Sequence, residues 1–154
     1  MSESVAPEVG TLDEEIVRSE IAWGRLISAI GRVPIDRTEE SGVCGAWSLK
    51  VLLAHITYWD AFEIDHIATR QTLGEIDWQS INEDHARLSA DRIFADVLGD
   101  MEATHKRLME HVATLPELDP ALFRELTHDH YVEHGNQVAD WIDRSSHGSS
   151  LEKQ

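Results

Sequence analysis

The feature that most constrains this 154-residue chain is the recurrence of apolar residues at steps of three and four in four long segments. That spacing places the apolar side chains along one face of an amphipathic helix. No run shows the strict alternation of apolar and polar residues that is typical of a half-buried strand. The sequence therefore predicts an all-α fold, in which four helices of roughly 20 to 25 residues pack as a four-helix bundle.

Local signals set the ends of the first two expected helices. Thr11 and Glu14 have the spacing of a capping box, in which each side chain bonds the backbone N–H of the other residue. The helix that begins there is expected to end at Gly31, because glycine is common just past a helix C-terminus. Ser48 is a good N-cap for a second helix, which is expected to run to about Arg70.

The second half of the chain is expected to hold the other two helices. A third helix is predicted from Ser89 to about Thr114. The fourth begins at Asp119, a capping residue that is followed by proline, and is expected to run to about Arg144. Between the second and third helices, residues 71–88 fit a short helix or a packed loop equally well.

The length and composition fit one globular domain, which is assigned to residues 11–144. Residues 1–10 and 145–154 are expected to be disordered tails. No stretch approaches the roughly 20 apolar residues that cross a bilayer, and the N-terminus lacks the basic and apolar regions of a signal peptide. A cytoplasmic protein without a membrane partner is therefore expected.

The acidity of the chain bears on its partners. Thirteen Lys and Arg residues stand against 29 Asp and Glu residues, which gives a formal net charge of −16. A chain of this sign is repelled by the phosphates of nucleic acids and by anionic lipid surfaces. No nucleic acid is therefore expected as a partner, and a small-molecule substrate is the expectation instead.

Three histidines lie close together in the segment HDHYVEHGNQ, residues 128–137. His130 and His134 are about one helical turn apart, so their Cβ atoms lie roughly 6 Å apart on one face and the two imidazoles can bind one metal. His128 is two residues from His130 and points elsewhere. The pair is expected to face the interior, because it continues an apolar stripe made of Phe123, Leu126, Val138 and Trp141.

His55 has the same inward placement on the second helix, between Leu52 and Trp59 at helical spacing. A buried imidazole needs hydrogen-bond partners or a metal, since leaving it unpaired costs roughly 1–3 kcal/mol. Three inward histidines from two helices can form a three-nitrogen site with open coordination positions, which is the arrangement of a catalytic metal. The alternative is that the same histidines are hydrogen-bonded core residues without a metal.

Four further residues are candidates for supporting roles. His66 falls on nearly the same face as His55 but about 16 Å further along the helix, too far to share a metal. His105 lies near the apolar face of the third helix and is a reserve ligand. Glu63 can serve as a base or support a ligand, and Cys44 precedes a helix N-terminus, where the pKa of a thiol can fall. The simpler interpretations are an exposed carboxylate for Glu63 and a small loop residue for Cys44.

Three segments resemble a known family. Residues 45–60, GAWSLKVLLAHITYWD, are similar to the second-helix signature of the DinB-like (YfiT-like) metalloenzyme superfamily, in which Trp-Ser precedes an apolar run that ends in Ala-His. Residues 130–134, HYVEH, resemble the HxxxH motif of its last helix. Residues 100–105, DMEATH, are similar to the third helix of its DfsB-like branch. The similarity extends over residues 11–144.

The resemblance implies a four-helix bundle of up-down-down-up type that is often dimeric, so a homodimer is expected. It also implies a divalent metal, nickel or zinc, on three histidines, which by position are His55, His130 and His134. Some members of the superfamily are thiol-dependent transferases or isomerases that use mycothiol, bacillithiol or glutathione. The first functional hypothesis is therefore a metal-dependent S-transferase or isomerase that uses a low-molecular-weight thiol and acts on a small electrophile.

Two alternatives stay open. The metal can instead activate water, which would make the protein a hydrolase or a detoxification protein. The bundle can also be non-enzymatic and bind a ligand or a partner, with its histidines hydrogen-bonded in the core. The residues do not choose between nickel and zinc, because imidazole suits both ions.

Overall fold

The computed structural model describes residues 8–152, apart from the side chains of residues 71–72 and 146–152. Over this range the fold is all-α, as the sequence predicted. None of the described helices combines the length and the apolarity that a membrane span requires. The predicted terminal tails fall partly on residues 1–7 and 153–154, which lie outside the described residues. The α-helices, in chain order, are α1 (Leu12–Gly31), α2 (Leu49–His66), α3 (Trp78–Ser89), α4 (Phe94–Val112), α5 (Pro120–Leu126) and α6 (His128–Glu152).

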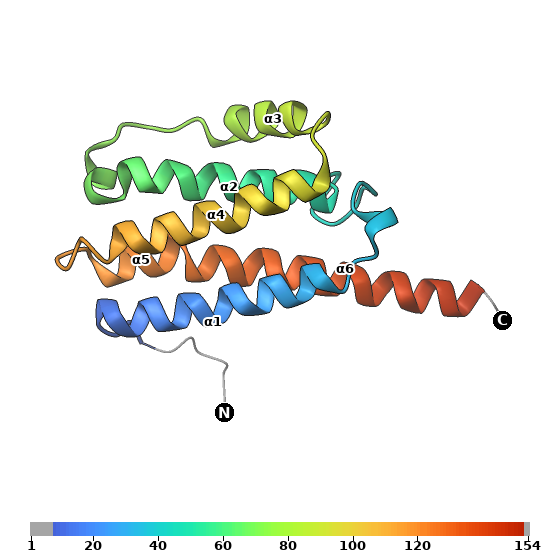
Figure 1. Cartoon of the computed structure of the whole chain (residues 1–154), viewed down its shortest axis with the longest axis horizontal. Helices are drawn as coiled ribbons and strands as arrows, with labels where there is room; N and C mark the ends of the chain where they lie inside the picture. Colours follow the sequence, from blue (N-terminus) through green and yellow to red (C-terminus); the bar gives the residue numbers. More distant parts are fainter. Residues whose placement is uncertain (1–7, 153–154) are drawn as a thin grey trace.

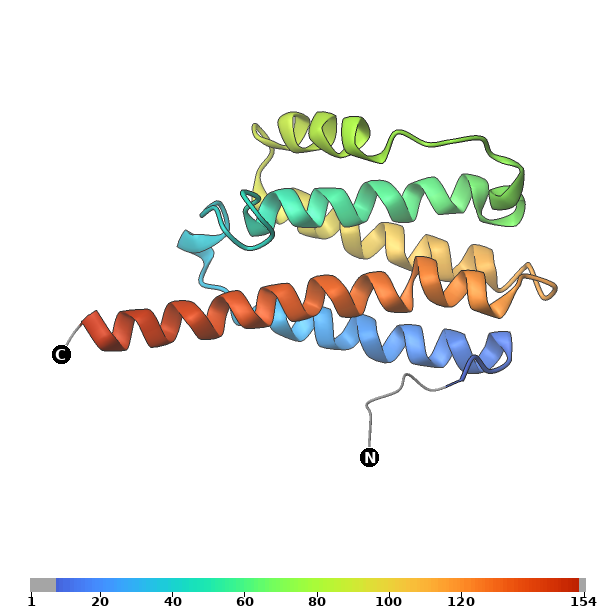
Figure 2. The ribbon, with the colours of Figure 1, turned by 180° about the vertical axis from the view of Figure 1, so that it is seen from behind.

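The four long helices α1, α2, α4 and α6 lie side by side with their axes nearly aligned (Figures 1 and 2). Helices α1 and α6 run in one direction and pack against each other, whereas α2 and α4 run in the opposite direction and form a second pair. Because α2 and α4 are parallel, the chain must return between them, and it does so along α2 through α3 (Figure 1). The short α5 packs against α6 and α1.

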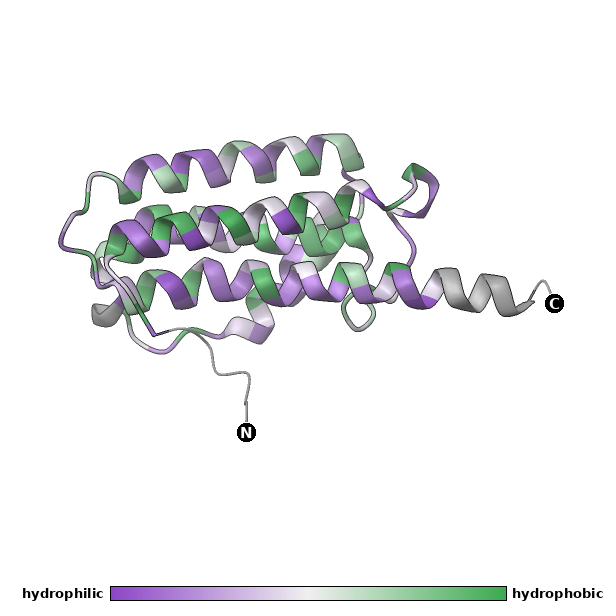
Figure 3. Ribbon diagram, turned by 90° about the horizontal axis from the view of Figure 1, so that it is seen from below, coloured by the Kyte–Doolittle hydropathy of each residue, from purple (hydrophilic) through white to green (hydrophobic). Residues whose placement is uncertain are grey.

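Burial of the apolar faces holds these helices together. Hydrophobic and hydrophilic residues are interspersed along the helices that Figure 3 colours. One cluster of fully buried side chains is built around Leu26, Leu52 and Met101, and a second is built around Leu108 and Phe123. Burying each of these side chains stabilises the fold by roughly 1.5–3 kcal/mol, which is why the helical register of the apolar residues fixes which face of each helix turns inward.

The expected starts of the first two helices are confirmed. The Thr11 hydroxyl accepts from the Glu14 N–H at 3.2 Å, and the Glu14 carboxylate accepts from the Thr11 N–H at 2.8 Å, so the capping box is complete. Helix α1 ends at Gly31, as expected. The Ser48 hydroxyl accepts from the Val51 N–H at 3.2 Å and begins α2.

The stretch between α2 and α4 departs from expectation. Part of the undecided segment forms helix α3, which includes Ser89, the residue predicted to start the third long helix. That long helix, α4, begins only at Phe94. The Lys50 ammonium group donates to the carbonyls of Ala90 and Arg92 at 3.0 and 2.9 Å, and these bonds hold the linker between α3 and α4 out of helix.

The predicted continuous helix from Asp119 to Arg144 is wrong in two respects. Thr127, which is fully buried, has φ −120° and ψ −73° and separates α5 from α6. Its hydroxyl donates to the carbonyl of Phe123 at 2.8 Å, so the side chain satisfies a backbone group at the break. Helix α6 then extends to Glu152, beyond the end expected at Arg144.

Candidate metal centre

Three histidines converge where α2 faces α6. The Nε2 atom of His130 lies 3.2 Å from Nε2 of His55 and 2.9 Å from Nε2 of His134. One nitrogen from each of the three rings lies within 4.8 Å of the other two. Two imidazoles bound to one tetrahedral zinc at the usual Zn–N distance have nitrogens about 3.3 Å apart. The three histidines that the sequence singles out therefore lie close enough together to hold one metal ion.

The surroundings of His55 determine which of its nitrogens carries the proton. The indole N–H of Trp59 donates to Oδ1 of Asn82 at 2.7 Å, which identifies that atom as an acceptor. The same oxygen lies 3.2 Å from Nδ1 of His55, so this nitrogen must be the donor. In the neutral ring, Nε2 then has a free lone pair, and it points toward His130.

His134 is oriented in the same manner. Its Nδ1 lies 2.7 Å from Oε1 of Gln137, one turn further along α6. With Nδ1 as the donor, the Nε2 lone pair of His134 also faces His130. The neutral His130 ring can donate one proton to only one of these two nitrogens, so the triad has more acceptors than donors. A divalent cation at the centre would satisfy all three nitrogens, and the donor set therefore fits a metal.

Burial keeps the three imidazoles neutral, which is the form that binds metals. Burial and the neighbouring His134 lower the pKa of His55 to about 4. Burial, followed by the adjacent His134 and His55, holds the pKa of His130 well below its ordinary value. Burial also lowers the pKa of His134, against the opposing effect of the Gln137 hydrogen bond. All three ligands are thus available near neutral pH without loss of a proton.

A cavity of about 430 Å³ opens beside the triad and is lined by His55 and His130. Trp59 and Trp78 form an aromatic wall, with ring centroids 4.5 Å apart. Asn82, which orients His55, also lines the cavity. Space for a small molecule therefore adjoins the nitrogens that can hold the ion.

Glu63 lies in this cavity as a buried group rather than as the exposed carboxylate of the simpler interpretation, since only 3% of it is exposed. The Nε atom of Arg70 donates to its two oxygens at 3.2 and 3.1 Å. Burial raises the pKa of Glu63, and Arg70 opposes that rise. The Glu63 carboxylate therefore positions Arg70 in the cavity. Because both of its oxygens accept from Arg70, it is poorly placed to act as a general base.

The remaining candidates lie apart from the triad. His105, the reserve ligand, bonds Tyr131 and Glu20 and is not part of the group that can hold an ion. His66 packs against the ring of Phe62, with centroids 4.4 Å apart. Cys44 is half-buried, and burial, followed by the nearby Glu133, raises the pKa of its thiol.

The sequence did not single out Tyr131, which is fully buried at the centre of a polar chain. Its hydroxyl donates to Oδ2 of Asp60 at 2.7 Å and lies 2.9 Å from Nδ1 of His105, whose ring stacks on Trp23 at 3.8 Å. Burial raises the pKa of Asp60 to about 7, although the Tyr131 hydrogen bond opposes this rise. The sequence signal that could have predicted these hydrogen-bonded residues is Asp60, a carboxylate on the buried side of the second helix.

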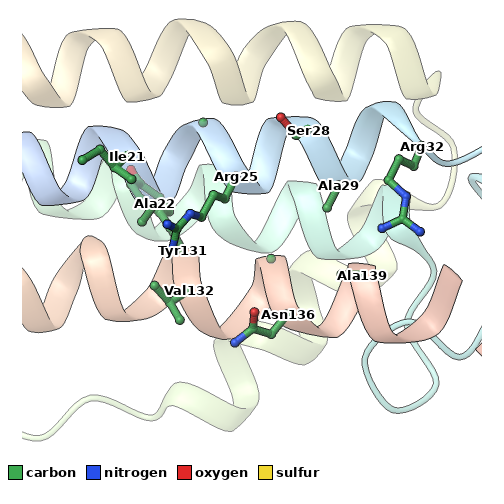
Figure 4. A pocket seen from close by; sticks show the side chains of 12 residues that line it. Ile21, Ala22, Arg25, Ser28, Ala29, Arg32, Tyr131, Val132, Asn136 and Ala139 are labelled. Carbon is green, nitrogen blue, oxygen red and sulfur yellow. The ribbon is translucent and has the colours of Figure 1, made fainter. Parts of the chain in front are cut away.

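A second cavity, of about 400 Å³, lies between α1 and α6 (Figure 4). It contains no member of the triad. Small residues such as Gly24, Ala29 and Gly135 form much of its lining, and Arg25 and Arg32 lie along it. The α1–α6 groove, as we call this feature, is therefore separate from the candidate metal centre.

Comparison with known proteins bears on the fold. No protein-family model matches the chain, and no curated protein matches it. The fold is similar to that of an uncharacterised protein from Escherichia coli UTI89 in a crystal structure, with a TM-score of 0.67, 12% sequence identity, and coverage of 88% of this chain and 95% of that one. At this identity the similarity concerns the fold alone.

Proposed function

We propose that this protein is a divalent-metal-dependent enzyme that acts on a small molecule, with the ion held by His55, His130 and His134. The observation that carries the proposal is the convergence of three Nε2 atoms beside a cavity of about 430 Å³. Structural zinc sites are usually closed by a fourth protein ligand, whereas catalytic sites keep a position open for substrate or water. Among the described residues the ligand group has three members, which fits the catalytic arrangement.

We assign the chain to the DinB-like superfamily within this proposal, as a four-helix bundle of the up-down-down-up type. Two observations support the assignment. Helices α1 and α6 run opposite to α2 and α4, which is the order of directions that the resemblance implies (Figure 1). The histidines that match the superfamily's ligand positions are also the ones that lie together.

The reaction proposed first is transfer or isomerisation with a low-molecular-weight thiol. When bound, nickel or zinc on three neutral imidazoles lowers the pKa of a coordinated thiol or water and so supplies a nucleophile near neutral pH. The protein contributes orientation, because Asn82 and Gln137 fix the imidazole rings through their Nδ1 atoms. Trp59 and Trp78 provide an apolar wall against which a substrate in the cavity can pack.

A second reaction, hydrolysis by activated water, is supported by one further observation. Glu133 lies between the two ligands of α6 in sequence and lines the cavity. A carboxylate in this place can take a proton from water during attack on a substrate. Hydrolysis that Glu133→Gln abolishes without loss of metal would support this second reaction.

We also propose that the protein is a homodimer, formed through the α1–α6 groove. Val17 and Ile21 on α1 are 59% and 54% exposed, which is unusual for large apolar side chains on a packed helix. The small residues of the groove allow close approach of a second chain. Size-exclusion chromatography with light scattering tests this, with Ile21→Glu expected to give monomers.

A cobalt-substituted sample tests the enzymatic proposal. Cobalt on three imidazoles gives visible absorption bands that respond to every change of its remaining ligands. We expect the spectrum to change when mycothiol, bacillithiol or glutathione is added, and we expect no such bands in His55→Ala. Cobalt bound stoichiometrically but unresponsive to all three thiols would overturn the transferase version and leave hydrolysis. A triad that binds no cobalt would overturn the proposal as a whole.

A further inference from the structure

The cavity beside the triad has an unbalanced charge. Four carboxylates line it, from Glu63, Glu125, Asp129 and Glu133, against the single guanidinium of Arg70. With neutral imidazoles the lining has a net charge of −3, and a bound divalent ion reduces this only to −1. The lining therefore repels anions whether or not the metal is present.

The positive charge of Arg70 is already engaged. Its Nε donates to both oxygens of Glu63, and 14% of its side chain is exposed. Its guanidinium also lies over the ring of Trp78, 5.0 Å from the centroid. An anionic substrate would have to compete with a buried carboxylate for this group, which costs more than binding to a free arginine.

The carboxylates at the rim are less engaged. Glu125 and Glu133 form no hydrogen bond or ion pair with any residue that the structure describes, and both are exposed. Asp129, between them, bonds His128 at 2.8 Å and lies 3.8 Å from Arg124. All three residues line the cavity, and Asp129 and Glu133 lie four positions apart on one face of α6, so together they form an acidic border of the cavity.

Another part of the lining is aromatic and already holds a cation. Trp59 and Trp78 lie in contact, and the Arg70 guanidinium packs on Trp78. The electron-rich faces of indole rings attract cations, and aromatic rings are the usual binding surface for organic ammonium groups. The cavity thus combines space for a small molecule, indole faces, and the carboxylates of Glu125 and Glu133, which form no hydrogen bond or ion pair with the described residues.

We infer that the cavity beside the histidines selects small molecules that carry a positively charged group on an apolar body, with the acidic border and the tryptophans holding the cation. This inference rests on the proposed function, because it treats the cavity as the substrate site of the metal centre. It narrows the substrate to an amine, a guanidine or a quaternary ammonium compound. Carboxylic acid substrates are disfavoured.

Matched probes that cannot coordinate a metal through an amine test this selection. Benzyltrimethylammonium, benzyl alcohol and phenylmethanesulfonate share one aromatic body and differ in charge. Binding is followed by NMR at the indole N–H signals of Trp59 and Trp78, in zinc-loaded and in metal-free protein. We expect the cation to bind at least about tenfold more tightly than the sulfonate in both samples.

Two double variants separate the cavity from the overall charge of −16. Glu125→Gln with Glu133→Gln is expected to reduce the preference for the cation to less than about threefold. Glu102→Gln with Glu110→Gln makes the same change of charge at exposed positions with the same spacing on α4, which does not line the cavity, and should leave the preference intact.

The outcomes are distinct. Equal loss in both double variants would show that the preference arises from the charge of the whole chain, and this would overturn the inference. Tighter binding of the sulfonate, or no binding of any probe at millimolar concentration, would overturn it as well. Zinc content, measured on the zinc-loaded samples, tests the proposed function separately. If protein incubated with zinc holds none but still prefers the cation, the metal centre is contradicted and the inference about the cavity is not.

Discussion

The hydroxyl of Tyr131 is the group whose removal most directly tests the buried polar chain. It donates to Oδ2 of Asp60 at 2.7 Å and lies 2.9 Å from Nδ1 of His105. Tyr131→Phe keeps the ring packing and leaves Oδ2 of Asp60 and Nδ1 of His105 without this partner, at a cost of about 1–3 kcal/mol each. Since Asp60 can relax by keeping its proton, we expect the free energy of unfolding to fall by about 3 kcal/mol. For a chain of this size the corresponding loss in Tm is about 6–12 °C.

Tyr58→Phe is the matched control, because its hydroxyl bonds none of the residues that the structure describes. Urea unfolding followed by circular dichroism at pH 6 measures both variants, and we expect the control to change stability by less than about 0.5 kcal/mol. A Tyr131→Phe variant as stable as the control would refute the assignment of the polar chain as a buried, stabilising network.

Three further predictions follow from the geometry. Burial raises the pKa of Asp60 from 3.8 to about 7, so the folded state keeps a proton that the unfolded state releases between these values. The contribution of Asp60 to stability is therefore full below about pH 4 and is lost as the pH rises to about 7. In urea titrations, the free energy of unfolding of the wild type, measured relative to that of Asp60→Asn, should fall by on the order of 4 kcal/mol across this range. Asn82→Leu removes the oxygen that orients His55 and should weaken zinc affinity about 10–100-fold in chelator competition, whereas Asn136→Leu on the other side of α6 should not. Burial and Glu133 raise the pKa of Cys44, so alkylation by iodoacetamide at pH 7.5 should be at least about tenfold slower than in the urea-unfolded chain; equal rates would contradict the buried thiol.

The starts of the first two helices and the triad could be predicted because they depend on local chemistry. The capping box at Thr11 and Glu14 uses only groups within one turn. The meeting of His55, His130 and His134 follows from placing the apolar stripes of two helices face to face, since each histidine occupies a position that an apolar residue would otherwise fill. A helical period read from the sequence is enough to make that prediction.

The break between α3 and α4 could not be predicted because a residue distant in sequence contacts it. Lys50, on α2, donates to the carbonyls of Ala90 and Arg92, and these bonds keep residues 90–93 out of a helix. Nothing in the sequence near residue 90 indicates this contact. The apolar stripe through His130 did not predict that Tyr131 is buried, because Tyr131 is about 100° away from His130 around the helix. The structure shows that α6 contacts α1 as well as facing α2, so its buried arc is wide enough to include Tyr131.

Elemental analysis of tag-free protein tests the metal centre most directly. Wild type, His130→Ala and His128→Ala are compared after incubation with zinc and nickel and removal of free ions. His128 is the matched control, because it lies two residues from His130 on the same helix and bonds Asp129 instead of the triad. We predict about one equivalent of metal in the wild type and in His128→Ala, and none in His130→Ala. Equal metal in all three proteins, or no metal in any of them, would contradict a metal centre on His55, His130 and His134.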